Sequence, residues 1–302
     1  MAATITPSVG DIAEDQGMWT GLKRSLAVAT AGNRRFWFAL TMLITLLAFG
    51  FLGPVILGAT DPMKLVGGLY DAPSKEHWLG TDNFGRSVLI QLMYGIRTSL
   101  KIGFIAGLVA TTIGVVIGTT AGYQGGRTEE GLMAFTNIVI TIPSLVILIL
   151  LSIALTTRSV ATMGLIIGLT SWPWTARAVR AQSSSLRTRE HVDIARISGS
   201  GSVSIILREI IPYMLSYIVM AFVLQLSAGV LQEAALSMLG LGPSNTISLG
   251  IMLHWALLWE SVRTGAWWAF VPPTVCLTLI AFSLLLLQSS MDEIFNPRLR
   301  RR

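Results

Sequence analysis

Six long runs of apolar residues constrain this chain more than any other feature. They cover approximately residues 36–57, 99–123, 132–155, 160–179, 213–239 and 267–289. A bilayer core about 30 Å thick needs roughly 20 apolar residues in helical form. The runs are continuously apolar, whereas the strands of a membrane barrel alternate over about ten residues. The sequence therefore predicts an all-α membrane protein with six transmembrane helices.

The composition excludes the main alternatives to a membrane protein. Hydrophobic residues make up 52% of the 302 residues and charged residues 13%, whereas soluble domains carry about 25% charged residues. The net charge of +6 would suit a nucleic-acid binder, but the basic residues fall between the apolar runs. We therefore expect no nucleic-acid partner. Cys276 is the one cysteine, so no intrachain disulfide and no cysteine-based metal site is expected.

The distribution of basic residues predicts the orientation in the membrane. The first 35 residues are polar, so the run 36–57 is an anchor and not a cleaved signal. Most of the 22 Lys and Arg residues fall on one side if the N-terminus is cytoplasmic, and an even number of spans then puts both termini there. We divide the chain into a cytoplasmic tail 1–35, a transmembrane domain 36–292 and a basic cytoplasmic tail 293–302. The first tail forms either a short amphipathic helix or a disordered segment.

Small residues and tryptophans mark two further features of the spans. Gly103 and Gly107 lie four residues apart, and Gly114, Gly118 and Gly122 form a second series with the same spacing. Such spacing places the glycines on one helix face, where another helix packs closely. A second group, near the outer end of the last span, forms either an interfacial aromatic belt or a stacking platform for a ring. It comprises Trp255, Trp259, Trp267 and Trp268.

The segment 180–212 is a long, basic connection in a chain that is otherwise strongly apolar. Val192, Ala195 and Arg196 fit one helical turn, Gly199 begins a turn, and Ile206 and Ile210 resume a helical stripe. The pattern predicts a helix, a turn and a second helix beneath the membrane. Its apolar face indicates a surface for a soluble partner.

Five short motifs follow one another along the chain. They are Leu79-Gly80-Thr81-Asp82 with Gly85-Arg86 and Tyr94-Gly95; Ala121-Gly122-Tyr123-Gln124-Gly125-Gly126; Asp193-Ile194-Ala195 with Gly199 and Ile210-Ile211-Pro212; Glu233-Ala234-Ala235-Leu236-Ser237 with Leu239-Gly240-Leu241-Gly242; and Asn296-Pro297-Arg298-Leu299. In order and spacing they resemble the motifs of the permease subunits of binding-protein-dependent ABC importers. The C-type subunit of the dipeptide and oligopeptide branch is the closest likeness, and the likeness covers nearly the whole chain after the N-terminal tail.

This resemblance implies a type I importer permease fold with a cytoplasmic coupling helix. It also implies that the segment 180–212 contacts an ATPase, through Asp193, Ala195, Arg196, Gly199, Ile210 and Pro212. Asp193 and Arg196 either contact the ATPase, cap their helix or are plain solvated charges, and Gly199 either makes the turn between the coupling helices or belongs to an ordinary flexible linker. The family's loop usually opens with Glu-Ala-Ala, whereas Asp193 and Ile194 stand here. Asp keeps the carboxylate, so we expect coupling to survive.

Four further residues are candidates for the translocation pathway or for its scaffold. Glu233 is predicted inside a span, where an ionised side chain is expensive and usually paired or facing water. With Ser237 it makes either a structural hydrogen bond or part of the pathway. Asp82 and Arg86 lie four residues apart, which suits a helical ion pair. We take that pair as scaffold, with contact to a binding protein as the alternative.

The chain itself is expected to be non-catalytic and to hold no cofactor and no metal. It contains no G-x-x-x-x-G-K-[ST] loop to cradle phosphates, and His77, His191 and His254 are too far apart in the topology to form a metal site. The resemblance implies that ATP and Mg²⁺ bind to two separate P-loop ATPase subunits. It further implies a second, B-type permease, an extracytoplasmic solute-binding protein and surrounding membrane lipid, all in the prokaryotic cytoplasmic (inner) membrane.

Peptides are the leading cargo, and two alternatives stay within the family, an oligosaccharide and nickel. The tryptophans near the last span would suit sugar stacking. Outside the family, an ion-coupled secondary carrier would be expected to show inverted repeats with broken helices, and we find no convincing repeat. A membrane scaffold without transport is the other alternative.

Overall fold

Helices form almost all of the ordered structure in the computed structural model, which describes residues 33–59 and 61–295. Within these ranges no strand forms, and two isolated bridges join Leu65 to Arg86 and Thr81 to Ser87. The predictions for the tail 1–32 and for Asn296-Pro297-Arg298-Leu299 lie outside the described residues. The elements are α2 (Arg34–Ile56), α3 (Val88–Gln124), α4 (Gly126–Thr141), α5 (Ser144–Ala154), α6 (Val160–Leu186), α7 (Glu190–Ile197), α8 (Ser202–Ile205), a π-helical turn (Ile206–Ile210), a 3₁₀ turn (Pro212–Met214), α9 (Leu215–Met238), α10 (Leu249–Leu258) and α11 (Trp267–Phe295).

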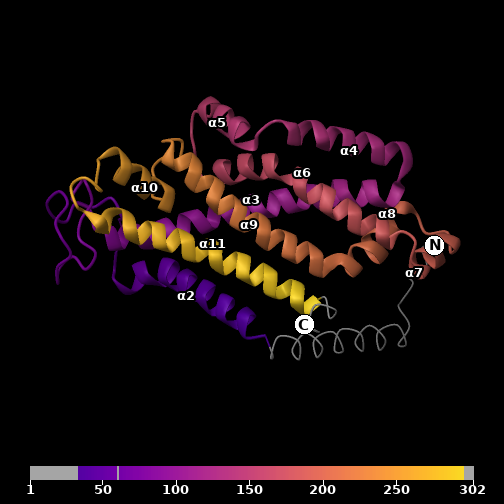
Figure 1. Ribbon diagram of the computed structural model, residues 1–302, viewed down its shortest axis with the longest axis horizontal. Coiled ribbons are helices and arrows are strands. Elements are labelled where there is room, and N and C mark those ends of the chain that lie inside the picture. Colours follow the sequence, from indigo (N-terminus) through magenta and orange to yellow (C-terminus); the bar gives the residue numbers. More distant parts are fainter. Residues whose placement is uncertain (1–32, 60, 296–302) are drawn as a thin grey trace, which may run out of the picture.

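The long helices lie side by side in one elongated bundle (Figure 1). α3, α6 and α9 run through its middle, α2 and α11 cover one side, and α4 and α5 line the opposite side. α10 and the segment 61–87 gather at one end of the bundle, and α7 and α8 lie at the other. We call these the α10 end and the α7 end.

The structure changes the predicted spans in four places. α3 begins at Val88, well before the predicted start at 99, and α6 continues to Leu186, into the segment assigned to the coupling loop. The predicted span 132–155 is two helices, α4 and α5, bent by 76°. The short apolar helix α10 was not predicted at all.

Fewer helices than six meet a simple criterion for crossing a membrane. Among the described residues, α2, α3, the continuous helical stretch ending in α9, and α11 are long and apolar enough, and α4 with α5 adds a fifth span if the bent pair is one. α6 is long enough but less apolar. Protein covers much of α6, including the fully buried Met163, Ile167 and Ala176, so it does not need an apolar surface all round.

The contact between α3 and α6 depends on glycines of both helices. A Cβ atom on Gly118 would lie 2.6 Å from the carbonyl oxygen of Ala176, and one on Gly122 would lie 2.6 Å from the carbonyl oxygen of Arg180. In the other direction, a Cβ atom on Gly168 would lie 2.8 Å from the carbonyl oxygen of Ala106. The two backbones therefore touch, as in small-residue contacts between membrane helices.

The earlier glycines of α3 face a different helix. A Cβ atom on Gly103 would lie 2.9 Å from the carbonyl oxygen of Leu226, and one on Gly107 would lie 2.9 Å from the amide nitrogen of Leu226. Gly229 of α9 approaches Gly103 in turn. The two predicted glycine series are thus close-packing faces, but the first packs on α9 and the second on α6.

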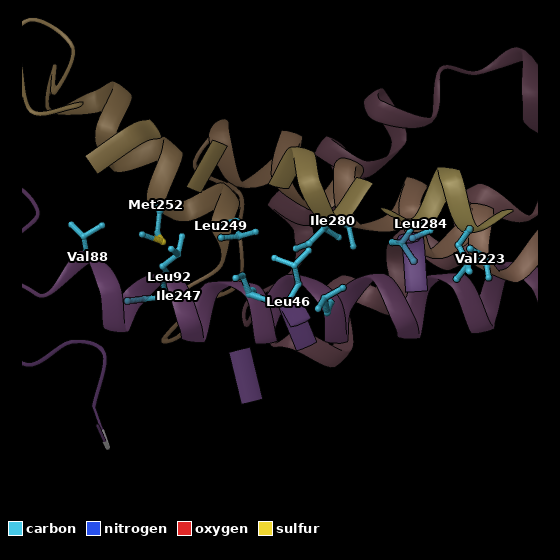
Figure 2. Close-up of a cluster of buried hydrophobic side chains, with 14 residues drawn as sticks. Leu46, Val88, Leu92, Val223, Ile247, Leu249, Met252, Ile280 and Leu284 are labelled. Carbon is cyan, nitrogen blue, oxygen red and sulfur yellow. The ribbon is translucent and has the colours of Figure 1, made fainter. Parts of the chain in front are cut away.

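The largest cluster of buried apolar side chains lies where α3 meets α2, α9, α10 and α11. Figure 2 shows Leu92, Leu249 and Ile280 in a row between α3 and the helices above it. Ile280 and Leu249 are fully buried. This cluster packs α2, α10 and α11 against α3, whereas the glycine contacts join α3 to α6 and α9.

Gly118→Ala is expected to destabilise the protein. The added methyl group meets backbone of α6, so the helices must separate, at a cost of about 1–3 kcal/mol. Thermal unfolding in mild detergent measures this as a lower midpoint. Gly131→Ala on α4 is the control, because a Cβ atom there meets nothing within 4 Å. Equal midpoints for both variants would contradict the packing argument.

Candidate functional site

A cleft opens beside the bend between α4 and α5. Ile142 has an extended backbone (φ −86°, ψ 124°) and precedes Pro143, which disfavours the helical conformation in the residue before it. The helix therefore stops and restarts in a new direction. The cleft has a volume of about 320 Å³ and lies between this bend, α6 and α9. Its lining comprises Val139, Ile140, Ile142, Ser144, Thr170, Ser171, Pro173, Trp174, Leu224, Gln225, Ala228 and Gln232.

Uncharged polar side chains line one wall of this cleft. Ser171 Oγ donates to Gln232 Oε1 at 3.2 Å, and Gln225 Nε2 donates to the carbonyl oxygen of Ser171 at 3.1 Å and to Thr175 Oγ1 at 2.6 Å. The sequence interpretation missed these residues. Gln225 and Gln232 lie seven residues apart in one span, a spacing that puts both on one helix face, and that signal was available.

Glu233, next to Gln232, lies in a different environment. Its side chain is fully buried, and its carboxylate accepts hydrogen bonds from Ser99 Oγ of α3 at 2.9 Å and from Ser237 Oγ at 2.6 Å. Ser99 Oγ also accepts from the amide of Leu249, the first residue of α10, at 3.2 Å. The carboxylate therefore joins α3 and α9 and, through Ser99, the start of α10. Neither Glu233 nor Ser237 lines the cleft.

The predicted helical ion pair between Asp82 and Arg86 does not form. These residues lie in a turn before α3, and Asp82 Oδ1 accepts from the backbone amides of Phe84 at 2.9 Å and Arg86 at 2.8 Å. Asp82 Oδ2 accepts from Gln91 Nε2 at 2.6 Å. A carboxylate followed by a short turn bonds its own backbone in preference to a side chain four residues on. Asp82 thus fixes the entry into α3.

Arg86 packs against aromatic rings at the α10 end. Its guanidinium lies 4.3 Å from the ring centroid of Phe84 and 5.1 Å from that of Trp255. Trp268 Nε1 donates to the carbonyl oxygen of Thr81 at 3.0 Å. The predicted tryptophan group therefore ties the segment before α3 to α10 and α11, while Trp259 and Trp267 stay about half exposed.

Tyr70 adds a further tie at this end. Its phenol donates to the carbonyl oxygen of Trp259 at 3.2 Å. Burial, and secondarily the charge of Asp82, raise the pKa of this phenol above its usual range.

At the α7 end, the segment that contains α7 and α8 is anchored from below by buried apolar side chains. Val192, Ile205 and Ile210 are buried against Tyr123 of α3 and Val179 of α6. We call residues 190–214 the α7–α8 unit. Its anchors belong to α3 and α6, and Met214 directly precedes α9, so the unit is joined to three helices of the bundle.

The outer surface of the α7–α8 unit is open and partly apolar. The side chains of Ile194, Ile197, Val203 and Leu207 are 59–86% exposed. Arg196 Nη1 donates to Asp193 Oδ1 at 2.9 Å, an ion pair between two half-exposed side chains. Exposed apolar side chains rimmed by charges are typical of a docking surface.

Gly199 makes the turn between the two helices of the unit. Its φ is +82°, in the left-handed region, and a Cβ atom there would meet nothing within 4 Å. The backbone conformation, not space within this chain, therefore requires glycine. Ala195 and Pro212, the other predicted coupling residues, are half-buried and exposed respectively.

Comparisons with known proteins agree with one another. Residues 114–301 match the family described as "Binding-protein-dependent transport system inner membrane component". The dipeptide transport system permease protein DppC of Bacillus subtilis is 30% identical over 287 residues, which cover 95% of this chain and 86% of that protein. The oligopeptide transport system permease protein OppC of Bacillus subtilis is 32% identical over 231 residues, which cover 76% of this chain and 74% of that protein.

A solved structure shares the fold. A chain of the inward-facing MetNI methionine ABC transporter matches with a TM-score of 0.53 and 20% identity, covering 70% of this chain and 97% of that chain. The predicted all-α importer permease fold is therefore confirmed.

Glu233→Ala is expected to lower stability. The substitution leaves the hydroxyl groups of Ser99 and Ser237 without their acceptor in a buried site, at a cost of about 1–3 kcal/mol. Gln232→Ala is the neighbouring control, since Gln232 lines the cleft. A thermal midpoint that falls for Glu233→Ala and holds for Gln232→Ala would support the scaffold role, and the reverse order would refute it.

Proposed function

This chain belongs to the family of binding-protein-dependent transport system inner membrane components, and from that premise we propose that it is the permease subunit of an ATP-driven importer of dipeptides or oligopeptides. One observation carries the cargo class: the similarity to a dipeptide permease extends over 95% of this chain. The chain is accordingly a multi-pass membrane protein and not itself an enzyme.

The proposed pathway is the cleft between the α4–α5 bend, α6 and α9. Its amide and hydroxyl groups, from Gln225, Gln232 and Ser171, offer hydrogen bonds to a polar solute within an otherwise apolar wall. A peptide backbone carries one donor and one acceptor at nearly every residue. An uncharged lining of this kind suits cargo with varied side chains.

A second permease subunit, of the B type, would close this pathway. The side of α4 and α5 beside the cleft carries exposed apolar side chains, including Ile138 and Ile153, both 65% exposed. A large exposed apolar face marks a protein or lipid contact. The polar cleft within that face favours a protein across it.

Two P-loop ATPase subunits would bind ATP and Mg²⁺, and one of them would seat the α7–α8 unit. The exposed side chains of Ile194, Ile197 and Val203 would enter its groove, with the Asp193–Arg196 pair at the edge. Closure of the ATPases on ATP would move the unit as a rigid body. Its buried anchors, Ile205 and Ile210, would pass the movement to the bundle.

The α7 end is then cytoplasmic, together with both termini, and the α10 end faces outward. A solute-binding protein would deliver the cargo there, over the surface that Asp82 and Arg86 stabilise from within. The cleft would open alternately to the two sides of the membrane. ATP and the loaded binding protein would each favour the state that they bind more tightly, because a ligand shifts only states with which it interacts differently.

Purification of the tagged chain from its native membrane tests this proposal. We expect a second permease and two P-loop ATPases to co-purify, and the reconstituted complex to take up labelled dipeptides or oligopeptides only with ATP and a binding protein. Uptake of an oligosaccharide or nickel in place of peptides would change the cargo. A chain that purifies alone, without ATP hydrolysis, would refute the importer.

Gly199→Val is expected to uncouple transport from ATP hydrolysis. A β-branched residue at φ +82° is strained by about 1–2 kcal/mol, which depopulates the docking conformation about 5- to 30-fold. Uptake should fall by that factor while the bundle stays folded, since the added side chain meets nothing within this chain.

Gly201→Val is the matched control for this variant. Gly201 lies in the same turn with open space around it, but its φ is −71°, which any residue adopts. The two variants are compared in the same vesicles, by uptake as the measure of transport and by circular dichroism as the measure of folding. Normal uptake with Gly199→Val would refute the coupling role of this turn.

A further inference from the structure

We propose that a groove between α2 and α3 binds one anionic phospholipid, with an acyl chain in the groove and the phosphate held by Arg97 and Lys101. The proposal requires only that the chain spans a membrane. It does not depend on the cargo or on the ATPase partners.

The groove is almost entirely apolar. It has a volume of about 440 Å³, within the usual range of ligand sites. Its lining comprises Leu43, Leu47 and Phe51 of α2, Leu100, Lys101, Phe104 and Ile105 of α3, Val160 and Ala161 of α6, Leu226 of α9 and Leu284 of α11. Lys101 is the single charged residue of this lining, so hydrocarbon is the matching occupant.

Two cations meet at one ring of this groove. The Arg97 guanidinium lies 5.3 Å from the ring centroid of Phe51, and Lys101 Nζ lies 6.0 Å from the same centroid. The residues are four apart on α3, so they share a helix face. Neither forms an ion pair with a carboxylate in the part of the chain that the structure describes. A ring contact leaves their N–H groups available for an anion.

The position of these cations along the bundle suits a lipid headgroup. Lys101 shares the groove with Val160, the first residue of α6, and with Ala161. The groove is therefore flanked by the start of α6, at the side that leads to the α10 end. An unpaired cation is expensive in the hydrocarbon layer but is stabilised at the level of the lipid phosphates.

A phospholipid satisfies both features at once, whereas other occupants satisfy one. A free anion leaves the groove empty, and a detergent or neutral lipid leaves the cations unpaired. A helix of a partner subunit would need a carboxylate at the level of Arg97 and Lys101. Charge complementarity together with the apolar slot therefore favours a lipid with a net negative headgroup.

Native mass spectrometry of the full-length chain, with whatever partners co-purify, tests this site. The probes are phosphatidylglycerol and phosphatidylcholine with identical acyl chains. We expect the protein to retain one phosphatidylglycerol in preference to phosphatidylcholine. Each of Arg97→Gln and Lys101→Gln should weaken that retention about fivefold, and the double variant about 30-fold, at about 1 kcal/mol for each cation.

Two further variants separate the charge from the slot. Ala161→Phe fills the groove and keeps both cations; Ala161 is exposed, so the chain is expected to fold, and retention of both lipids should fall. Lys64→Gln with Lys75→Gln is the matched control, because it removes the same charge from exposed positions before α3 and should change nothing.

Four outcomes would overturn the site. They are equal retention of the two lipids by the unmodified protein, unchanged retention by the Arg97 and Lys101 double variant, unchanged retention by Ala161→Phe, and an equal loss in the control. A complex in which a partner helix fills the groove would retain no phosphatidylglycerol there and would overturn it too. Failure of partners to co-purify leaves the lipid measurement on the chain intact and counts only against the importer.

Discussion

The close approach of α3 to α6 is the contact on which the other features of the bundle depend. Lipid tails are as apolar as leucine, so burial of apolar surface gives little drive for helices to associate in a membrane, and close packing must supply it. The two backbones touch at glycines of both helices, which are Gly114, Gly118 and Gly122 of α3 and Gly164 and Gly168 of α6. α6 lines the cleft, and α3 and α6 together supply the residues on which the α7–α8 unit packs.

One proline converts this packed bundle into a structure with a cleft. α4 lies along α6. Arg180 of α6 forms an ion pair with Glu129 of α4, and Arg177 of α6 donates hydrogen bonds to Asn137 of α4. Beyond Pro143 the chain changes direction by 76°, so α5 does not continue along the line of α4. The cleft lies beside this bend, and Ser171, Gln225 and Gln232 are part of its lining.

Sequence periodicity anticipated the helices and the nature of the glycine faces, because twenty apolar residues in a row have few other uses. It also anticipated the helix, turn and helix around Gly199. It placed the start of α3 at residue 99 and the end of α6 at residue 179, whereas the helices begin at Val88 and end at Leu186, because apolar composition marks the apolar part of a helix and not its ends. Spacing alone also suggested a helical ion pair between Asp82 and Arg86. In the structure the Asp82 carboxylate instead accepts hydrogen bonds from the backbone amides of the turn that follows it. Ser237, four residues on in the same helix, was anticipated as a partner of Glu233, but Ser99 of α3 is 134 residues away in sequence, and no local pattern reveals it.

Gln232 and Glu233 are neighbours in one membrane helix but have different roles, since Gln232 lines the cleft and Glu233 joins α9 to α3. Successive residues of a helix point about 100° apart, so one side chain reaches the cleft and the next reaches the contact with α3. The ionisable group lies on the buried face, where two serine hydroxyls satisfy it, and the amide lies on the open face. A charge in the cleft would favour cargo of one sign. Because no charged residue lines the cleft, a transporter built on it would leave the choice of cargo charge to the protein that delivers it.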